Sequence, residues 1–187
     1  CPSRTGGVLG RQEHQTPRKL QAAGFPFQAS LEQSDFTLRP ELKRAVMVRF
    51  FDSAFIEKAS ALILVGASGL GKTHLAVALG TKMVQLGYQV RFLTAQQFAN
   101  SILAAGGRAA IERALQPLLR CDLLILDDFR LLPLAPQLGP ATYELLAGRY
   151  ERRAKVITPN KSPAHLGDFI GDNALTSART DRLLPQP

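Results

Sequence analysis

The segment ALILV (61–65), followed directly by GASGLGKT (66–73), decides the fold. The first part is a short, fully apolar run, which is typical of a strand buried in a parallel sheet. The second part matches the phosphate-binding pattern G-x-x-x-x-G-K-[ST] at every fixed position. Apolar residues then recur at helical spacing, at Leu75, Leu79, Met83 and Leu86. A strand, this loop and a helix in succession predict a site that binds the phosphates of a nucleotide.

Each residue type in this loop has a physical role in holding a triphosphate. Glycines let successive backbone amides turn inward, and the positive end of the following helix adds to the attraction for an anion. Lys72 is predicted to reach the β- and γ-phosphates, and the Thr73 hydroxyl is predicted to bind Mg²⁺. The residues predicted to bind ATP are Gly66, Ala67, Ser68, Gly69, Leu70, Gly71, Lys72, Thr73 and His74.

A second apolar run ends in two acidic residues. Leu123–Leu126 fits a buried strand that lies two elements past the loop, and Asp127 and Asp128 follow it. Asp127 is predicted to hold Mg²⁺ through water, with Thr73 binding the same ion, and Asp128 is predicted to polarise the attacking water. Phosphoryl transfer requires mainly positioning and charge from the protein, so these carboxylates favour nucleotide hydrolysis.

A third feature follows the next predicted strand, in VITPN (156–160). If this strand lies between the two motif strands, Asn160 lies beside the γ-phosphate and can orient water. The motifs therefore nominate Lys72, Asp128 and Asn160 as catalytic residues.

The remaining apolar patterns predict an α/β chain. Further strands are expected at 88–93 and 155–158, with a strand at 122–126 for the acidic motif, helices at about 94–105, 108–119 and 141–152, and a proline-rich loop at 131–140. Strands that alternate with helices predict βαβ units and a parallel sheet, here the three-layer sandwich of a P-loop NTPase. Residues 1–17 have no apolar period and are predicted to be a disordered tail, with one domain over 18–187.

Composition limits the possible classes of protein. The 187 residues are 45% hydrophobic, enough for a sizeable core, and no apolar run approaches the length of a membrane span. The two cysteines provide no disulfide framework, so a reducing, cytoplasmic location is expected. The net charge of +8, concentrated in residues 61–120, favours polyanionic partners such as nucleic acid.

Several segments together resemble one family. These are GKTHLA (71–76), LLILDDF (123–129), RYE (149–151), ITPN (157–160) and DRLL (181–184), with FP (25–26) and SDF (34–36) upstream. They resemble the IstB-like helper ATPases of bacterial insertion sequences, which are relatives of DnaC-type helicase loaders in the AAA+ class. The resemblance covers about residues 18–184, and the segments follow the family's order.

The resemblance implies more than the motifs alone. It implies a sheet of strand order 5-1-4-3-2, ATP-driven homo-oligomers on DNA, and the transposase of the same element as a partner. It also implies that Arg182, in the Asp-Arg-Leu segment, acts as an arginine finger across a subunit interface. A cation supplied in trans makes hydrolysis depend on assembly.

The chain departs from the family's pattern at four places. Pro159 stands where a small hydroxyl residue is usual, Arg130 where glycine is usual, and Asp128 where glutamate is frequent. The chain ends at LPQP (184–187), before the family's fifth strand, so we expect a C-terminally incomplete domain. Position 1 is cysteine rather than methionine, so we expect a fragment or a processed or mistranslated product.

Two groups of arginines are candidates for contact with DNA phosphates. The first comprises Arg108, Arg113 and Arg120 in a predicted helix. The second comprises Arg149, Arg152 and Arg153, which the spacing places on one helix face. Contacts of this kind position a protein on DNA without reading its sequence. No aromatic residue is interleaved with the first group, and Phe50, Phe51 and Phe55 are expected in the core.

Three functions are compatible with the sequence. The first is an ATP-hydrolysing, DNA-associated helper of transposition. The second is a helicase loader of the same fold that acts on single strands. The third is a truncated nucleotide-binding remnant that does not hydrolyse ATP. A small-molecule kinase is disfavoured, since the chain has no Arg-rich lid segment after the core.

Overall fold

The computed structural model describes residues 16–30, 49–66, 69–129 and 136–159. Within these residues, four parallel strands form one sheet in the order β1-β4-β3-β2. The strands are β1 (Ala61–Ile63), β2 (Val90–Thr94), β3 (Leu123–Phe129) and β4 (Ala154–Pro159). This order matches the 1-4-3-2 part of the expected order 5-1-4-3-2, and residues 160–187 lie outside the described residues.

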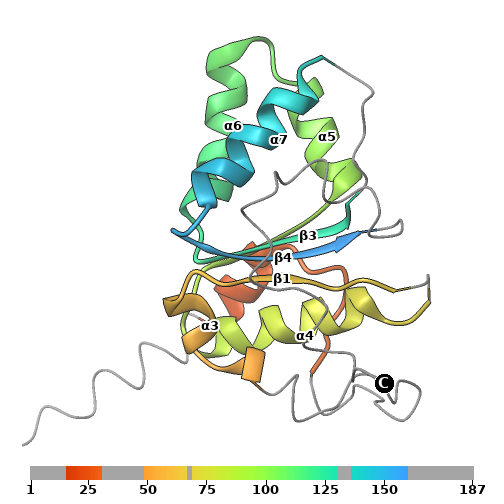
Figure 1. Ribbon diagram of the computed structural model, residues 1–187, viewed down its shortest axis with the longest axis vertical. Coiled ribbons are helices and arrows are strands. Elements are labelled where there is room, and N and C mark those ends of the chain that lie inside the picture. The colour runs from red at the N-terminus through yellow and green to blue at the C-terminus, as the bar shows by residue number, and fades with distance from the viewer. Residues whose placement is uncertain (1–15, 31–48, 67–68, 130–135, 160–187) are drawn as a thin grey trace, which may run out of the picture.

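Helices cover both faces of the sheet and give three layers (Figure 1). One face carries α4 (Lys72–Gln85) and α3 (Ala54–Glu57), which follows the short helix η1 (Arg49–Phe51). The other carries α5 (Ala95–Leu103), α6 (Arg108–Arg120) and α7 (Leu138–Arg149). The predicted α/β sandwich is therefore confirmed. None of the described helices is both long enough and apolar enough to span a bilayer.

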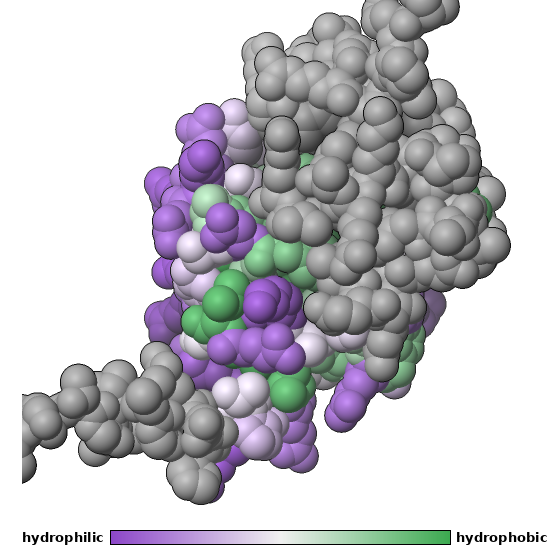
Figure 2. Space-filling model, turned by 90° about the horizontal axis from the view of Figure 1, so that it is seen from below, coloured by the Kyte–Doolittle hydropathy of each residue, from purple (hydrophilic) through white to green (hydrophobic). Residues whose placement is uncertain are grey.

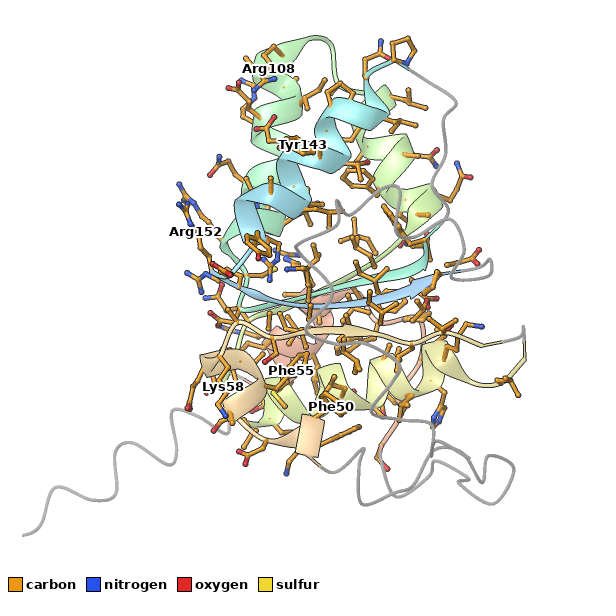
Figure 3. All side chains as sticks on the ribbon, viewed as in Figure 1. Phe50, Phe55, Lys58, Arg108, Tyr143 and Arg152 are labelled. Carbon is orange, nitrogen blue, oxygen red and sulfur yellow. The ribbon has the colours of Figure 1, made fainter. Side chains whose placement is uncertain are left out.

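Alternation along β3 divides the core into two clusters. Leu123 and Ile125 pack with α4 and with Phe51 and Phe55 on one face. Leu124 and Leu126 pack with α5, α6 and α7 on the other face, as expected for side chains that alternate along a strand. The expectation that the phenylalanines belong to the core is confirmed, with Phe50 partly buried against the same cluster (Figure 3). The outer surface beneath α3 and α4 mixes hydrophilic and hydrophobic residues (Figure 2).

The segment before the first strand packs onto α4. Residues 16–23 form a helix, and Phe25 lies against Phe92 with ring centroids 6.2 Å apart. Gly80, within α4, permits this approach, because a Cβ there would lie 2.8 Å from the Phe25 ring. The segment that contains this helix and Phe25 is therefore part of the domain's core.

Two predictions around α7 are wrong. The loop expected over 131–140 ends earlier, because α7 already begins at Leu138, and Pro140 is accommodated in its first turn, where a missing amide hydrogen costs little. Arg149 is not on an exposed face shared with Arg152 and Arg153. It is the last residue of α7 and is completely buried, while the other two follow the helix in the connection to β4.

Candidate nucleotide-binding site

The loop between β1 and α4 has the backbone that its glycines predict. Gly69 and Gly71 have φ angles of +81° and +66°, a region that side-chain-bearing residues rarely adopt. Gly71 is the N-cap of α4, so the positive end of this helix faces the loop. The Lys72 ammonium donates a hydrogen bond to the Gly66 carbonyl at 2.8 Å, which places the cation on the loop itself.

Thr73 and Asp127 meet across 54 positions of sequence. The Thr73 hydroxyl lies 2.9 Å from Oδ1 and 3.0 Å from Oδ2 of Asp127. The first turn of α4 and the end of β3 therefore bring together the two residues predicted to hold Mg²⁺. Asp127 is 6% exposed, so its carboxylate is largely shielded from bulk water.

The two acidic residues lie in a bulge of β3 rather than beyond the strand. Leu126 pairs with Ile157 and Phe129 with Pro159, so Asp127 and Asp128 together lie opposite the single residue Thr158. Asp128 has a φ angle of +51° and an exposed side chain. A bulge of this kind redirects side chains, and here it buries one carboxylate and exposes the next.

The structure adds Thr158, which the sequence analysis did not nominate. Its hydroxyl lies 2.5 Å from Asp127 Oδ1 and 2.9 Å from the backbone nitrogen of Asp128. It is 2% exposed and belongs to β4, which lies between β1 and β3, the arrangement on which the prediction for Asn160 depends. The only signal in the sequence for Thr158 was its position near the end of the strand that pairs with β3, the strand that carries Asp127 and Asp128.

The donor set fits a small divalent cation that prefers oxygen. Mg²⁺ is usually bound through one or two protein oxygens, water and the phosphates of its substrate. The Thr73 hydroxyl and the Asp127 carboxylate form such a pair at the end of the phosphate loop. These two residues would hold Mg²⁺ beside a bound nucleotide.

The remaining predicted site residues fall into two groups. His74 stacks on Phe27 with centroids 5.9 Å apart, and Leu70 is exposed beside the loop. Other residues that the sequence singled out lie outside the described residues, namely Ala67, Ser68, Arg130, Asn160 and Arg182.

The arginines that are candidates for DNA contact differ in their exposure and in their ion pairs. Arg108 lies at the end of α6 away from the sheet and pairs with Glu112 at 2.6 Å and Glu144 at 3.2 Å (Figure 3). Arg113 and Arg120 are exposed and seven positions apart on α6, so they share one face of the helix. Arg152 is exposed beside the sheet, and Arg153 pairs with Asp122 at 2.7 Å.

Comparison with known proteins places this architecture in a family. The sequence model of the family described as IstB-like ATP binding protein matches residues 7–187. A protein of insertion sequence IS21 from Pseudomonas aeruginosa is 37% identical over 94% of the chain and 66% of its own length. A protein of IS5376 from Geobacillus stearothermophilus is 28% identical over 95% of the chain and 70% of its own length. The chain thus spans about two thirds of the length of these relatives, both named as ATP-binding proteins.

Solved structures share the fold at low sequence identity. The structure of DnaI is 21% identical, with a TM-score of 0.56, and the match covers 91% of this chain and 92% of the DnaI chain. The DnaC helicase loader is 20% identical with a TM-score of 0.55, over 89% of both chains. AMPPCP-bound DnaA from Aquifex aeolicus reaches a TM-score of 0.64 at 19% identity, over 87% of this chain and 49% of its own. With the fold of AAA+ P-loop proteins and a family match over almost its whole length, the chain belongs to the IstB-like ATP-binding proteins of insertion sequences.

Proposed function

We propose that this chain binds ATP with Mg²⁺ and hydrolyses it as a DNA-associated helper of insertion-sequence transposition. The observation that carries the proposal is the meeting of Thr73 and Asp127 within 3.0 Å at the end of a phosphate-binding loop. The relatives named for insertion sequences favour transposition as the context.

The residues of the chain have distinct roles in this proposal. Backbone amides of the loop and the Lys72 ammonium hold the phosphates, while Thr73 and Asp127 hold Mg²⁺. When bound, the metal neutralises charge that develops on the phosphate oxygens. The exposed carboxylate of Asp128 and the side chain of Asn160 orient the attacking water.

Assembly completes the site in this proposal. Arg182 of a neighbouring copy places a cation against the γ-phosphate, so hydrolysis depends on the formation of a homo-oligomer. DNA is bound through arginine contacts to its phosphates, with Arg113 and Arg120 as candidates because both are exposed on one face of α6. The transposase of the same element is the proposed protein partner.

Duplex DNA is expected to stimulate phosphate release from ATP by this chain. Because the contacts are with phosphates, the stimulation should fall steeply as salt rises from about 50 to 200 mM. The measurement is the rate of phosphate release with duplex DNA, with single-stranded DNA and with neither.

Each outcome of this assay distinguishes between the open functions. Stimulation by single strands alone, with capture of a replicative helicase, would favour a helicase loader. Release no faster than in protein-free buffer, under every condition, would favour a non-hydrolysing remnant and contradict the proposal.

A further inference from the structure

We infer that Thr158 is a positioning residue that holds both carboxylate-bearing residues of the site in place before a nucleotide arrives. This inference rests on the proposed ATP hydrolysis and extends it to a residue outside the phosphate-binding and acidic motifs. The juxtaposition that carries it is one buried hydroxyl opposite the two-residue bulge Asp127–Asp128.

The direction of each hydrogen bond follows from the partners. The backbone nitrogen of Asp128 can only donate, so the Thr158 oxygen accepts from it at 2.9 Å. A carboxylate can only accept, so the one hydroxyl hydrogen of Thr158 points to Asp127 Oδ1, 2.5 Å away. The hydroxyl thus connects the backbone of one acidic residue with the side chain of the other.

This connection has a specific task at the bulge. In a regular ladder, the amide at the position of Asp128 would donate to a carbonyl of a neighbouring strand or point away from it. Here Asp128 has a φ angle of +51°, which is costly for a residue with a side chain. A hydrogen bond from its amide to Thr158 stabilises this conformation, and with it the exposure of the Asp128 carboxylate.

Thr158 also differs from Thr73, which contacts the same carboxylate. Thr73 is a predicted metal ligand, so its hydroxyl has a second role when Mg²⁺ and nucleotide are bound. Thr158 is 2% exposed and lies in the middle layer, on β4. It can therefore hold Asp127 Oδ1 both with and without bound Mg²⁺ and nucleotide, which fixes the orientation of the carboxylate.

The test compares Thr158→Val, which removes the hydroxyl at nearly constant shape, with Thr158→Ser, which retains it. Two readouts are independent of catalysis: amide hydrogen exchange of Asp128 without nucleotide, and the Mg²⁺ concentration that half-saturates binding of a fluorescent ATP analogue. Leaving a buried donor or acceptor without its hydrogen-bond partner changes an equilibrium constant by roughly tenfold. Thr158→Val is therefore expected to raise both the exchange rate and the Mg²⁺ requirement by about tenfold, and Thr158→Ser by less than about threefold.

A matched control is Thr142→Val, because Thr142 is a buried threonine of α7 and is 8% exposed. It should leave both readouts unchanged. Equal readouts in wild type and Thr158→Val would overturn the inference, as would equal impairment of the valine and serine variants. If Thr158→Val does not fold, Thr158→Ala takes its place with the same expected direction. If the wild type shows no Mg²⁺-dependent nucleotide binding, the proposed function fails, while Asp128 exchange still decides whether Thr158 holds the bulge.

Discussion

Replacing Lys72 by alanine is expected to lower ATP-dependent phosphate release by about 100-fold or more, the usual effect of removing one preorganised electrostatic group from an active site. The Lys72 ammonium lies on the phosphate loop, within 2.8 Å of the Gly66 carbonyl, at the start of α4. No neighbouring cation of α4 substitutes for it, since the other lysine of this helix, Lys82, is in its last turn. Phosphate release by the purified Lys72→Ala variant, under conditions where the wild type is active, measures the effect.

Lys82→Ala is the matched control for this experiment. It removes the same side chain from the same helix, but at the end far from the loop, where Lys82 is exposed. Its rate should stay within about twofold of wild type, because surface substitutions away from special features change little. Equal rates in the wild type and Lys72→Ala would exclude the loop as the site of hydrolysis.

The second large effect concerns stability. Arg149→Met is expected to lower the free energy of unfolding by about 3 kcal/mol, since several buried carbonyl groups would lose a charged donor. The Arg149 guanidinium donates to the carbonyls of Leu118 at 2.6 Å and Cys121 at 2.9 Å, and to that of Ala154. It thereby joins the end of α6 to the start of β4.

Two opposing terms decide the sign of this effect. Burial lowers the pKa of the Arg149 guanidinium, so the charge is costly to bury and methionine removes that cost. Methionine also removes every donor, and it leaves carbonyls that lie in the interior without compensation. Loss of the donors should dominate, because one guanidinium serves carbonyls of α6, of β4 and of the residues between α6 and β3.

Thermal unfolding measures this effect. For a domain of this size, about 3 kcal/mol corresponds to a decrease in Tm of roughly 6–12 °C. Arg152→Met, in the exposed connection three residues further on, is the control and should change Tm by less than about 2 °C. An unchanged Tm for Arg149→Met would show that the carbonyl network contributes little to stability.

Much of the fold could be predicted from local signals. The phosphate loop at 66–73, the apolar runs that became β1 and β3, and the capping threonine Thr94 each specify an element by their own chemistry. Thr94 accepts from the Gln97 amide at 3.1 Å, while the Gln97 side chain accepts from the Thr94 amide at 2.8 Å, so α5 begins where expected. Strand order came from the family resemblance, because periodicity does not reveal which strands pair.

The errors concern properties that depend on tertiary contacts. The spacing of Arg149, Arg152 and Arg153 suggested one basic face, but spacing carries no information on where a helix ends. Arg149 proved to be the interior donor to the carbonyls at the end of α6. Thr158 was missed for a related reason, because its role exists only when β4 pairs with β3 across the bulge.

The most direct test of the central claim is the effect of Mg²⁺ on ATP affinity, measured by titration calorimetry. If Thr73 and Asp127 share the metal beside the nucleotide, Mg²⁺ should tighten ATP binding to the wild type by at least about tenfold, or 1.4 kcal/mol. In Asp127→Asn, which preserves size but removes the charge, that gain should largely disappear while ATP binding without Mg²⁺ persists. An equal gain from Mg²⁺ in the wild type and in Asp127→Asn, or no ATP binding by the wild type, would contradict it.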